Sequence, residues 1–233
     1  MIIGISGVTT NNSGVYIGTM GAGKTTTADY IANAHGYASV GLLDLGKRLA
    51  KELFDFSDDQ LWGNLKNTPD PRYVHRYDID EVNPNIVAHP VYLTPRLALQ
   101  KLGTEFGRAC YSDIWIDRAL QTARTLLAAQ DGSDRSPVMY TASEGISEWP
   151  SLAIKGVVFH DIRYVNEAEA LRRAGGKLIR VRRKMDTDAT VKDTHPSELG
   201  LLFLGDDKFD YVIDNAEDLE ALYAKVDVMM QQF

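Results

Sequence analysis

A glycine-rich run near the start of the chain is the feature that most limits what the chain can fold into. Residues 18–25 read Gly-Thr-Met-Gly-Ala-Gly-Lys-Thr and fit the pattern GxxxxGK[ST]. Such glycines let backbone N–H groups turn inward around phosphate oxygens, and the following helix points its N-terminus at the same anion. Because a β-prone run precedes the loop and a helical stretch follows it, we predict a nucleotide-phosphate site at Gly21, Ala22, Gly23, Lys24, Thr25 and Thr26.

Within this loop, Lys24 is expected to reach the β- and γ-phosphates, and the Thr25 hydroxyl to bind Mg²⁺. Two registers are open. If residues 8–18 are an insertion, Gly7 serves as the first glycine, Ile2–Ser6 is the central strand, and a flap emerges beside the phosphates. Otherwise Val15–Ile17 is the strand and residues 1–13 are an extension. The flap is slightly favoured, and residues 21–26 keep their roles in both registers.

Short apolar strands alternate with helices along the rest of the chain, which predicts an α/β fold with helices on both faces of a parallel sheet. Residues 57–93 are rich in Asp, Asn, Pro and Tyr and are expected to be irregular, with one short helix. The clearest βαβ unit has a strand at 157–160, a helix at 166–174 capped by Asn166, and a strand at 177–183.

Charged residues follow two of these strands, at the sheet edge where ligands bind in open α/β folds. The strand at 157–160 delivers Asp161, a candidate Mg²⁺ ligand through water, and then Arg163. The strand at 177–181 delivers Arg182, Arg183 and Lys184. Phosphoryl transfer depends on positioning and on cations that stabilise spreading negative charge, so Lys24, Asp161, Arg182 and Arg183 are the candidate catalytic residues.

A helix over residues 94–110 begins at Thr94 and Pro95, a cap followed by proline at the first helical position. At about 100° per residue, one face is apolar and the other combines polar side chains with Gly103 and Gly107. Glycines weaken a helix, so this face is interpreted as the surface for a second substrate, although close helix packing is the alternative. Arg96 or Arg108 would hold a phosphate there, and Gln100 or Thr104 would hydrogen-bond a base.

Composition narrows the class of partner. The chain carries 25 Lys and Arg against 32 Asp and Glu, a formal net charge of −7, which disfavours a protein that grips nucleic-acid polymers. A single cysteine, Cys110, fits a reducing compartment, and the chain lacks a run of about 18 apolar residues that would cross a membrane. We therefore expect a soluble, cytoplasmic protein with small-molecule partners.

Several blocks together resemble the deoxynucleoside monophosphate kinases of tailed bacteriophages and their bacterial relatives, in the adenylate-kinase-like branch of P-loop kinases. The resemblance covers nearly the whole chain and rests on residues 2–7 with 21–27, 41–47, 94–108, 113–115, 161–168 and 193–198. It implies a three-layer nucleoside monophosphate kinase fold in one domain, 1–233. It also implies a mobile monophosphate-binding region at 57–110 and a mobile lid at 182–200, with Arg182 and Arg183 over the phosphates.

For function, the resemblance implies transfer of the ATP γ-phosphate to a deoxynucleoside monophosphate, with Mg²⁺, for DNA precursor synthesis. The host cytoplasm would be the location if the chain is phage-encoded, and a homodimer is left open. The monophosphate would be bound by Arg96, Gln100, Thr104, Arg108, Arg163 and Lys47.

Two departures from the family pattern stand out. Residues 8–18 interrupt the phosphate loop, and Gly46 stands beside Lys47 where the family has an apolar residue, with the preceding proline missing. The alternatives are another small-molecule P-loop kinase, of the dephospho-coenzyme A or shikimate kinase type, and a non-catalytic nucleotide-binding switch. The NKxD guanine motif is absent from the sequence, which disfavours a GTPase switch.

Overall fold

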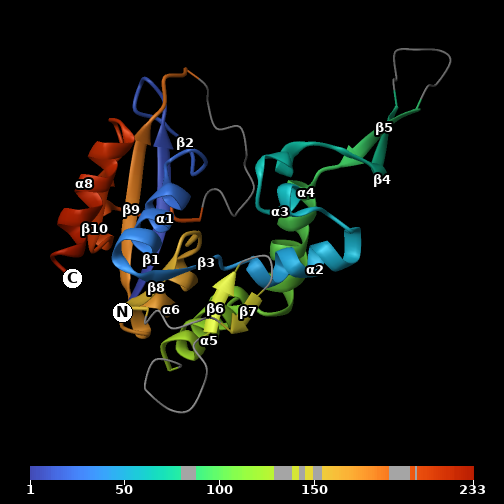
Figure 1. Ribbon diagram of the computed structural model, residues 1–233. Coiled ribbons are helices and arrows are strands. Elements are labelled where there is room, and N and C mark those ends of the chain that lie inside the picture. The colour runs from blue at the N-terminus through green and yellow to red at the C-terminus, as the bar shows by residue number, and fades with distance from the viewer. Residues whose placement is uncertain (80–87, 129–137, 142–144, 149–153, 189–199, 203) are drawn as a thin grey trace. The chain divides into compact units, whose positions relative to one another are not determined.

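The computed structural model describes the chain except for residues 80–87, 129–137, 142–144, 149–153, 189–199 and 203 (Figure 1). The chain folds into two compact units. The first combines residues 1–42 with 112–233, and the second spans residues 43–111.

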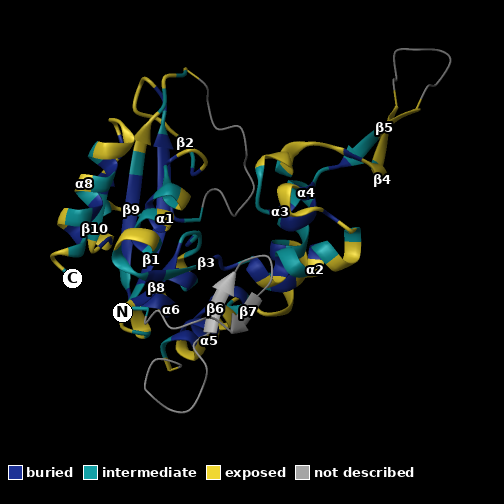
Figure 2. Ribbon diagram, viewed as in Figure 1, coloured by how far each residue is buried: buried dark blue, intermediate teal, exposed yellow. Residues whose placement is uncertain are grey.

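A six-stranded sheet forms the first unit, in the order β10-β9-β1-β8-β3 with β2 paired to β1. Every pairing is parallel except that of β2 with β1. The strands are β1 (Ile2–Thr10), β2 (Tyr16–Gly18), β3 (Tyr37–Val40), β8 (Gly156–Phe159), β9 (Lys177–Lys184) and β10 (Tyr211–Asp214). The central strands β1 and β8 and the first half of β9 are buried (Figure 2), as a sheet covered on both faces requires.

Alternate residues of β1 pack against helices on opposite faces of this sheet. Ile3 and Ile5 join a core cluster with Ile31 of α1 (Lys24–His35) and Val226 of α8 (Leu219–Met230). Gly4, between them, approaches Leu171 of α6 (Val165–Arg173) so closely that a Cβ there would clash. The helix α5 (Ile114–Ala128) packs on α6 and β8. The predicted three-layer α/β fold is confirmed.

A two-stranded sheet joins a group of helices in the second unit. Its helices are α2 (Asp44–Phe54), α3 (Asp58–Leu61), the 3₁₀ helix η1 (Asn64–Asn67), α4 (Pro95–Gln100) and the π-helix η2 (Lys101–Arg108), and its strands are β4 (Asp70–Ile79) and β5 (Ala88–Leu93). Their core cluster includes Phe56, Leu61 and Leu99.

One expectation about this part of the chain was wrong. Residues 70–79 and 88–93 were expected to be irregular, but they form an antiparallel pair. Most of β4 is exposed, so its sequence lacks the apolar alternation that marks a half-buried strand. Further along the chain, β6 (Val138–Thr141) and β7 (Gly145–Glu148) form a second hairpin, and η3 (Asp206–Lys208) precedes β10.

Candidate active site

The phosphate loop links β2 to α1. Gly21 and Gly23 have φ angles of 78° and 101°, in the left-handed region that favours glycine. Gly23 is the N-cap of α1, and its helix start has no side-chain cap. Lys24 donates from Nζ to the Thr19 carbonyl oxygen at 2.7 Å, which brings the ammonium back over the start of the loop. A helix N-terminus preceded by such a turn suits an anion, so the local geometry fits a triphosphate.

Gly7, rather than Gly18, is the glycine that packs against the lysine. A Cβ at Gly7 would lie 2.6 Å from Cγ of Lys24 and 2.9 Å from Cβ of Ala22, whereas a Cβ at Gly18 would meet nothing within 4 Å. Gly7 lies in the central strand, which pairs with β8 and β9. The register with Gly7 as first glycine is therefore the one adopted.

The insertion at residues 8–18 is a β-hairpin that lengthens the central strand. Thr9 donates from its hydroxyl to the Gly18 carbonyl at 3.0 Å, and the Asn11 side chain accepts from two backbone N–H groups in the turn. The backbone N–H of Asn12 donates to the Thr187 carbonyl at 2.9 Å. The predicted flap is thus an ordered hairpin, tied at its turn to the chain that leaves β9.

Asp161 and Arg163 lie just beyond the carboxyl end of β8 and form an ion pair, with Nη2 to Oδ1 at 3.1 Å. The backbone N–H groups of Arg163 and Tyr164 both donate to Oε2 of Glu167, which is buried. The predicted cap at Asn166 was wrong, because α6 begins one residue earlier and Glu167 holds the turn.

The Asn166 side chain contacts the start of α5 and does not cap α6. Its Nδ2 donates to Oδ1 of Asp113 at 2.6 Å and to the carbonyl oxygen of Ser112. Two of the sequence blocks that carry the family resemblance, 113–115 and 161–168, are therefore joined to each other at the start of α5.

The two candidate arginines at the end of β9 differ sharply. Arg182 forms ion pairs with Asp214 at 2.6 Å and with Asp206 at 2.5 Å. These carboxylates raise the pKa of Arg182, and in turn Arg182 lowers the pKa of Asp214. The side chain of Arg183 is exposed and forms no hydrogen bond or ion pair with a residue that the structure describes. Of the two, Arg183 is the cation that is available to a phosphate.

A third arginine of β9 anchors the chain that returns from the predicted lid. Arg180 is 1% exposed and donates to the carbonyl oxygens of Leu201 and Leu204 and to Asp206. Its guanidinium also lies 4.0 Å from the ring centroid of Phe209. Most of the predicted lid, including His195, Ser197 and Glu198, lies outside the described residues.

The predicted acceptor helix begins as expected, because the Thr94 hydroxyl accepts from the Leu97 N–H at 3.1 Å. From Lys101 to Arg108 it is a π-helix, which turns less per residue than an α-helix. The faces assigned at 100° per residue therefore shift. Phe106, which falls on the face predicted to be apolar, is 59% exposed, and Gly107, on the predicted polar face, is buried.

Gly103 is also buried, and a Cβ on it would lie 3.4 Å from the side chain of Leu43. A distance of 3.4 Å is an ordinary van der Waals contact, so packing against Leu43 does not by itself require glycine at this position. The interpretation of this face as a surface for a second substrate stays a prediction. Among the predicted acceptor residues, Arg96, Gln100, Thr104 and Arg108 are all partly exposed on this helix. Lys47 is largely buried, with its ammonium 3.3 Å from Oδ1 of Asp44 and 5.5 Å from the ring centroid of Trp62.

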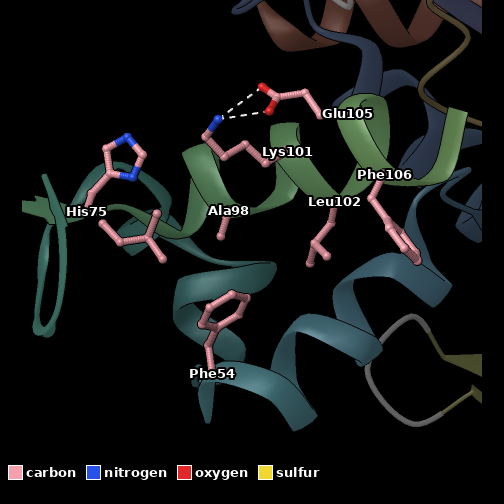
Figure 3. A pocket seen from close by; sticks show the side chains of 8 residues that line it. Phe54, His75, Ala98, Lys101, Leu102, Glu105 and Phe106 are labelled. Atoms are coloured by element: carbon pink, nitrogen blue, oxygen red, sulfur yellow. Dashed lines mark hydrogen bonds and ion pairs between the residues drawn. The ribbon is translucent and has the colours of Figure 1, made fainter. Parts of the chain in front are cut away.

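A cavity of about 430 Å³ opens along the same helix (Figure 3). Lys101 and Glu105 form an ion pair at 2.9 Å on its rim. None of the predicted acceptor residues lines this cavity. The sequence did not predict it, because its wall is formed by residues from separate elements. The lining residues are Phe54, His75, Leu93, Ala98, Lys101, Leu102, Glu105 and Phe106.

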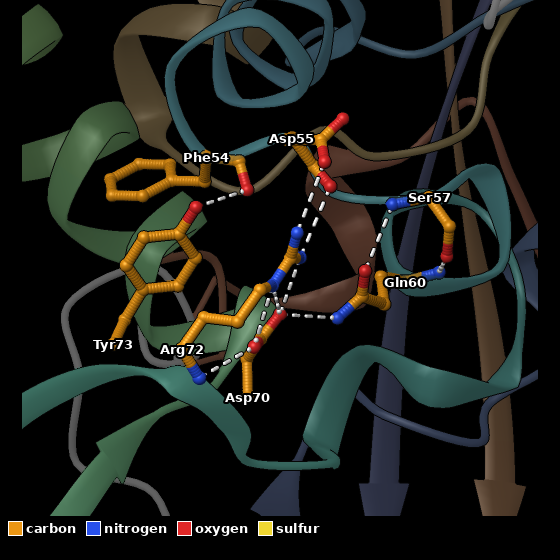
Figure 4. A network of polar contacts seen from close by, with 7 residues as sticks. All are labelled: Phe54, Asp55, Ser57, Gln60, Asp70, Arg72 and Tyr73. Atoms are coloured by element: carbon orange, nitrogen blue, oxygen red, sulfur yellow. Dashed lines mark hydrogen bonds and ion pairs between the residues drawn. The ribbon is translucent and has the colours of Figure 1, made fainter.

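A polar network holds β4 to the turn after α2 (Figure 4). Asp70 is buried and accepts hydrogen bonds from Gln60 and from the Arg72 guanidinium, which also reaches Asp55. Hydrogen bonds from Arg72 hold the pKa of Asp70 well below its usual range. The Tyr73 hydroxyl donates to the Phe54 carbonyl at 2.7 Å, so the network fixes one wall of the cavity.

The predicted site residues thus fall in both units. Those for ATP and for transfer lie in the first, together with Arg163, while Lys47, Arg96, Gln100, Thr104 and Arg108 lie in the second. Within the described residues, no group of three or more His, Cys, Asp or Glu side chains is placed to hold a metal ion. None of the described helices has the length and apolar character to cross a membrane.

A parallel sheet in the order β3-β8-β1-β9-β10, with a phosphate loop between the β1–β2 hairpin and α1, defines the class as a P-loop kinase fold. Residues 143–226 match the family model described as deoxynucleotide monophosphate kinase. The chain is also 28% identical over 214 residues to the "Putative deoxynucleotide monophosphate kinase" of Acanthamoeba polyphaga mimivirus, covering 90% of this chain and 91% of that protein.

These matches confirm the predicted resemblance to deoxynucleotide monophosphate kinases. The matching relative comes from a giant virus, so the expected link to bacteriophages has weaker support than the link to the kinase family.

Proposed function

We propose that this protein transfers the γ-phosphoryl group of ATP to a deoxynucleoside monophosphate. An oxygen of the acceptor's phosphate forms a bond to the γ-phosphorus as the bond to the β–γ bridging oxygen breaks, and ADP leaves. The observation that carries the proposal is the close packing of Lys24 against Gly7 of the central strand, in a chain similar to deoxynucleotide monophosphate kinases.

The donor would be held by the phosphate loop. Backbone N–H groups of residues 21–26 surround the anion, and Lys24 exchanges its bond to the Thr19 carbonyl for one to the β- and γ-phosphates. Thr25, at the start of α1, would bind Mg²⁺ directly, and Asp161 would bind it through water. When bound, the ion supplies positive charge that offsets the charge developing on the phosphates.

Cationic side chains near the transferred group would supply the rest of the stabilisation. Arg183 is our main candidate, because Arg182 is already paired with two carboxylates. Arg163 forms an ion pair with Asp161 just beyond β8, and it would bind the phosphate of the acceptor. Such charges act mainly by being fixed in place before the reaction, so no acid–base pair is required.

The second unit would supply the rest of the acceptor site. We propose that Arg96 or Arg108 binds the monophosphate and that Gln100 or Thr104 hydrogen-bonds the base. The π-helix supports this choice, because such segments are rare and often occur at functional sites. Lys47 is a weaker candidate for binding the substrate, because its ammonium is already paired with Asp44.

The alternatives gain no support. A kinase of the shikimate or dephospho-coenzyme A type would share the phosphate loop, but the matched family and relative are named for deoxynucleotide monophosphates. A nucleotide switch would hydrolyse ATP slowly whatever acceptor is present.

A coupled assay for ADP tests the proposal. ADP formation from ATP and Mg²⁺ is measured without acceptor and then with dAMP, dGMP, dCMP or dTMP, and with shikimate and dephospho-coenzyme A as control acceptors. We expect a large stimulation by at least one deoxynucleotide and none by the controls. Equal, slow ADP formation under all conditions would refute the proposal and favour the switch.

A further inference from the structure

One buried polar side chain outside the predicted site touches the phosphate loop. Asn215 directly follows β10 and is only 7% exposed. Its Nδ2 donates to the Ala22 carbonyl oxygen at 3.0 Å. Its backbone N–H donates to the Arg182 carbonyl at 2.7 Å, so the residue is fixed to β9 while its amide reaches the loop.

Gly23 allows this approach. A Cβ on Gly23 would lie 2.5 Å from Nδ2 of Asn215, and the glycine has a φ of 101°. Any larger residue would therefore both strain the backbone and push the asparagine away from the Ala22 carbonyl. Gly23 is therefore needed for two reasons: the positive φ of the turn before α1, and the space that Asn215 occupies.

The hydrogen bond sets the direction of a phosphate-binding amide. In a trans peptide the C=O and the following N–H point in opposite directions. With the Ala22 carbonyl held by Asn215, the N–H of Gly23 must point away from Asn215. A peptide followed by glycine can flip easily, since glycine tolerates φ angles of either sign. Asn215 removes that freedom in the free protein, before the nucleotide arrives.

We propose that Asn215 is a positioning residue that orients the Gly23 amide toward the triphosphate. This rests on the proposed use of the loop for ATP. Because binding no longer has to order the peptide, the donor site is preorganised. The contribution concerns ATP, because Asn215 contacts the backbone of the phosphate loop itself.

Two variants that lack the N–H donor test the role: Asn215→Ala, which adds no charge, and Asn215→Asp, which keeps the shape. Losing a hydrogen bond of ordinary strength should raise the KM for ATP about three- to tenfold and leave the KM for the deoxynucleotide unchanged. Ile213→Val is the matched control, because it trims a buried side chain of β10 that belongs to the core cluster with Ile31 and Val226.

Binding of inorganic triphosphate, measured by calorimetry, supplies a readout that does not depend on turnover. Its Kd should rise by a similar factor in both Asn215 variants and stay unchanged in Ile213→Val. The proposal is overturned if the two KM values change together, or if the variants lose thermal stability while triphosphate binds as before. If the unaltered protein shows no acceptor-dependent turnover, the proposed function fails, and triphosphate binding still decides the role of Asn215.

Discussion

Adding a single methyl group at Gly7 tests which glycine completes the phosphate loop. In Gly7→Ala the new Cβ would lie 2.6 Å and 2.8 Å from Cγ and Cδ of Lys24, and 2.9 Å from Cβ of Ala22. Real Cβ atoms do not approach other atoms so closely, so the lysine stem, the loop or both must move. The atoms involved are near the lysine backbone, where the side chain has little freedom to swing aside.

The size of the effect follows from the packing. Inserting a methyl group into a well-packed site costs typically about 1–3 kcal/mol. If the methyl group raises the free energy of the ATP-bound state by this amount, because Lys24 must keep its position there, kcat/KM for ATP falls about 5- to 150-fold. A change of about 1.4 kcal/mol corresponds to a tenfold change in rate.

Gly18→Ala is the matched control, because Gly18 fits the first position of the GxxxxGK[ST] pattern but has open space around it. Its φ of 147° makes alanine strained there, so stability should fall modestly. In the coupled ADP assay we expect Gly18→Ala to keep kcat/KM for ATP within about threefold of the unaltered protein. A larger loss in Gly18→Ala than in Gly7→Ala would refute the assignment of Gly7.

Three further predictions concern the acceptor site, the transferring arginine and stability. Arg96→Ala should raise the KM for the deoxynucleotide far more than the KM for ATP, and equal increases would contradict its placement on the acceptor side. Arg183→Ala should lower kcat at least tenfold without changing the melting temperature, since its side chain forms no described ion pair. Arg182→Ala should lower the melting temperature, because it removes the ion pairs with Asp206 and Asp214 and leaves Asp206 paired with Arg180 alone. A reversed pattern in these two variants would make Arg182 the catalytic arginine. The pKa of Asp70 is lower in the folded protein than in the unfolded chain, where an Asp has a pKa of about 3.9. The ionised carboxylate therefore stabilises the fold fully above about pH 3.9, and this stabilisation is lost as the pH falls below that value. Asp70→Asn should therefore unfold at a lower temperature at pH 7 and lose less stability on acidification than the unaltered protein, and parallel pH profiles would contradict this.

The sequence predicted the layered fold well because the strands and helices of the first unit have strong local patterns. A continuous apolar run marks β8, Leu178, Ile179 and Val181 mark β9, and the glycine loop marks the start of α1. The register around residues 8–18 stayed open because both candidate strands are β-prone. Only the pairing of β1 with β8 and β9 decides between them, and this involves partners more than 150 residues away.

The candidate site was harder to predict, for physical reasons that differ between residues. Arg182 and Arg183 look equivalent in the sequence, but Arg182 meets Asp206 and Asp214, which follow 24 and 32 residues later. The faces of residues 101–108 were assigned for an α-helix, and the π-helix that forms there does not follow that period. Asn215 carries no motif, and its role depends on a contact 193 residues away in the chain.

Direct detection of the transferred group tests the central claim most closely. ATP labelled in its γ-phosphate is mixed with Mg²⁺, a deoxynucleoside monophosphate and excess protein, and the labelled products are separated. We predict that the label appears in the deoxynucleoside diphosphate, and that Lys24→Ala abolishes this transfer. Label released only as inorganic phosphate, or transfer that persists in Lys24→Ala, would contradict the account.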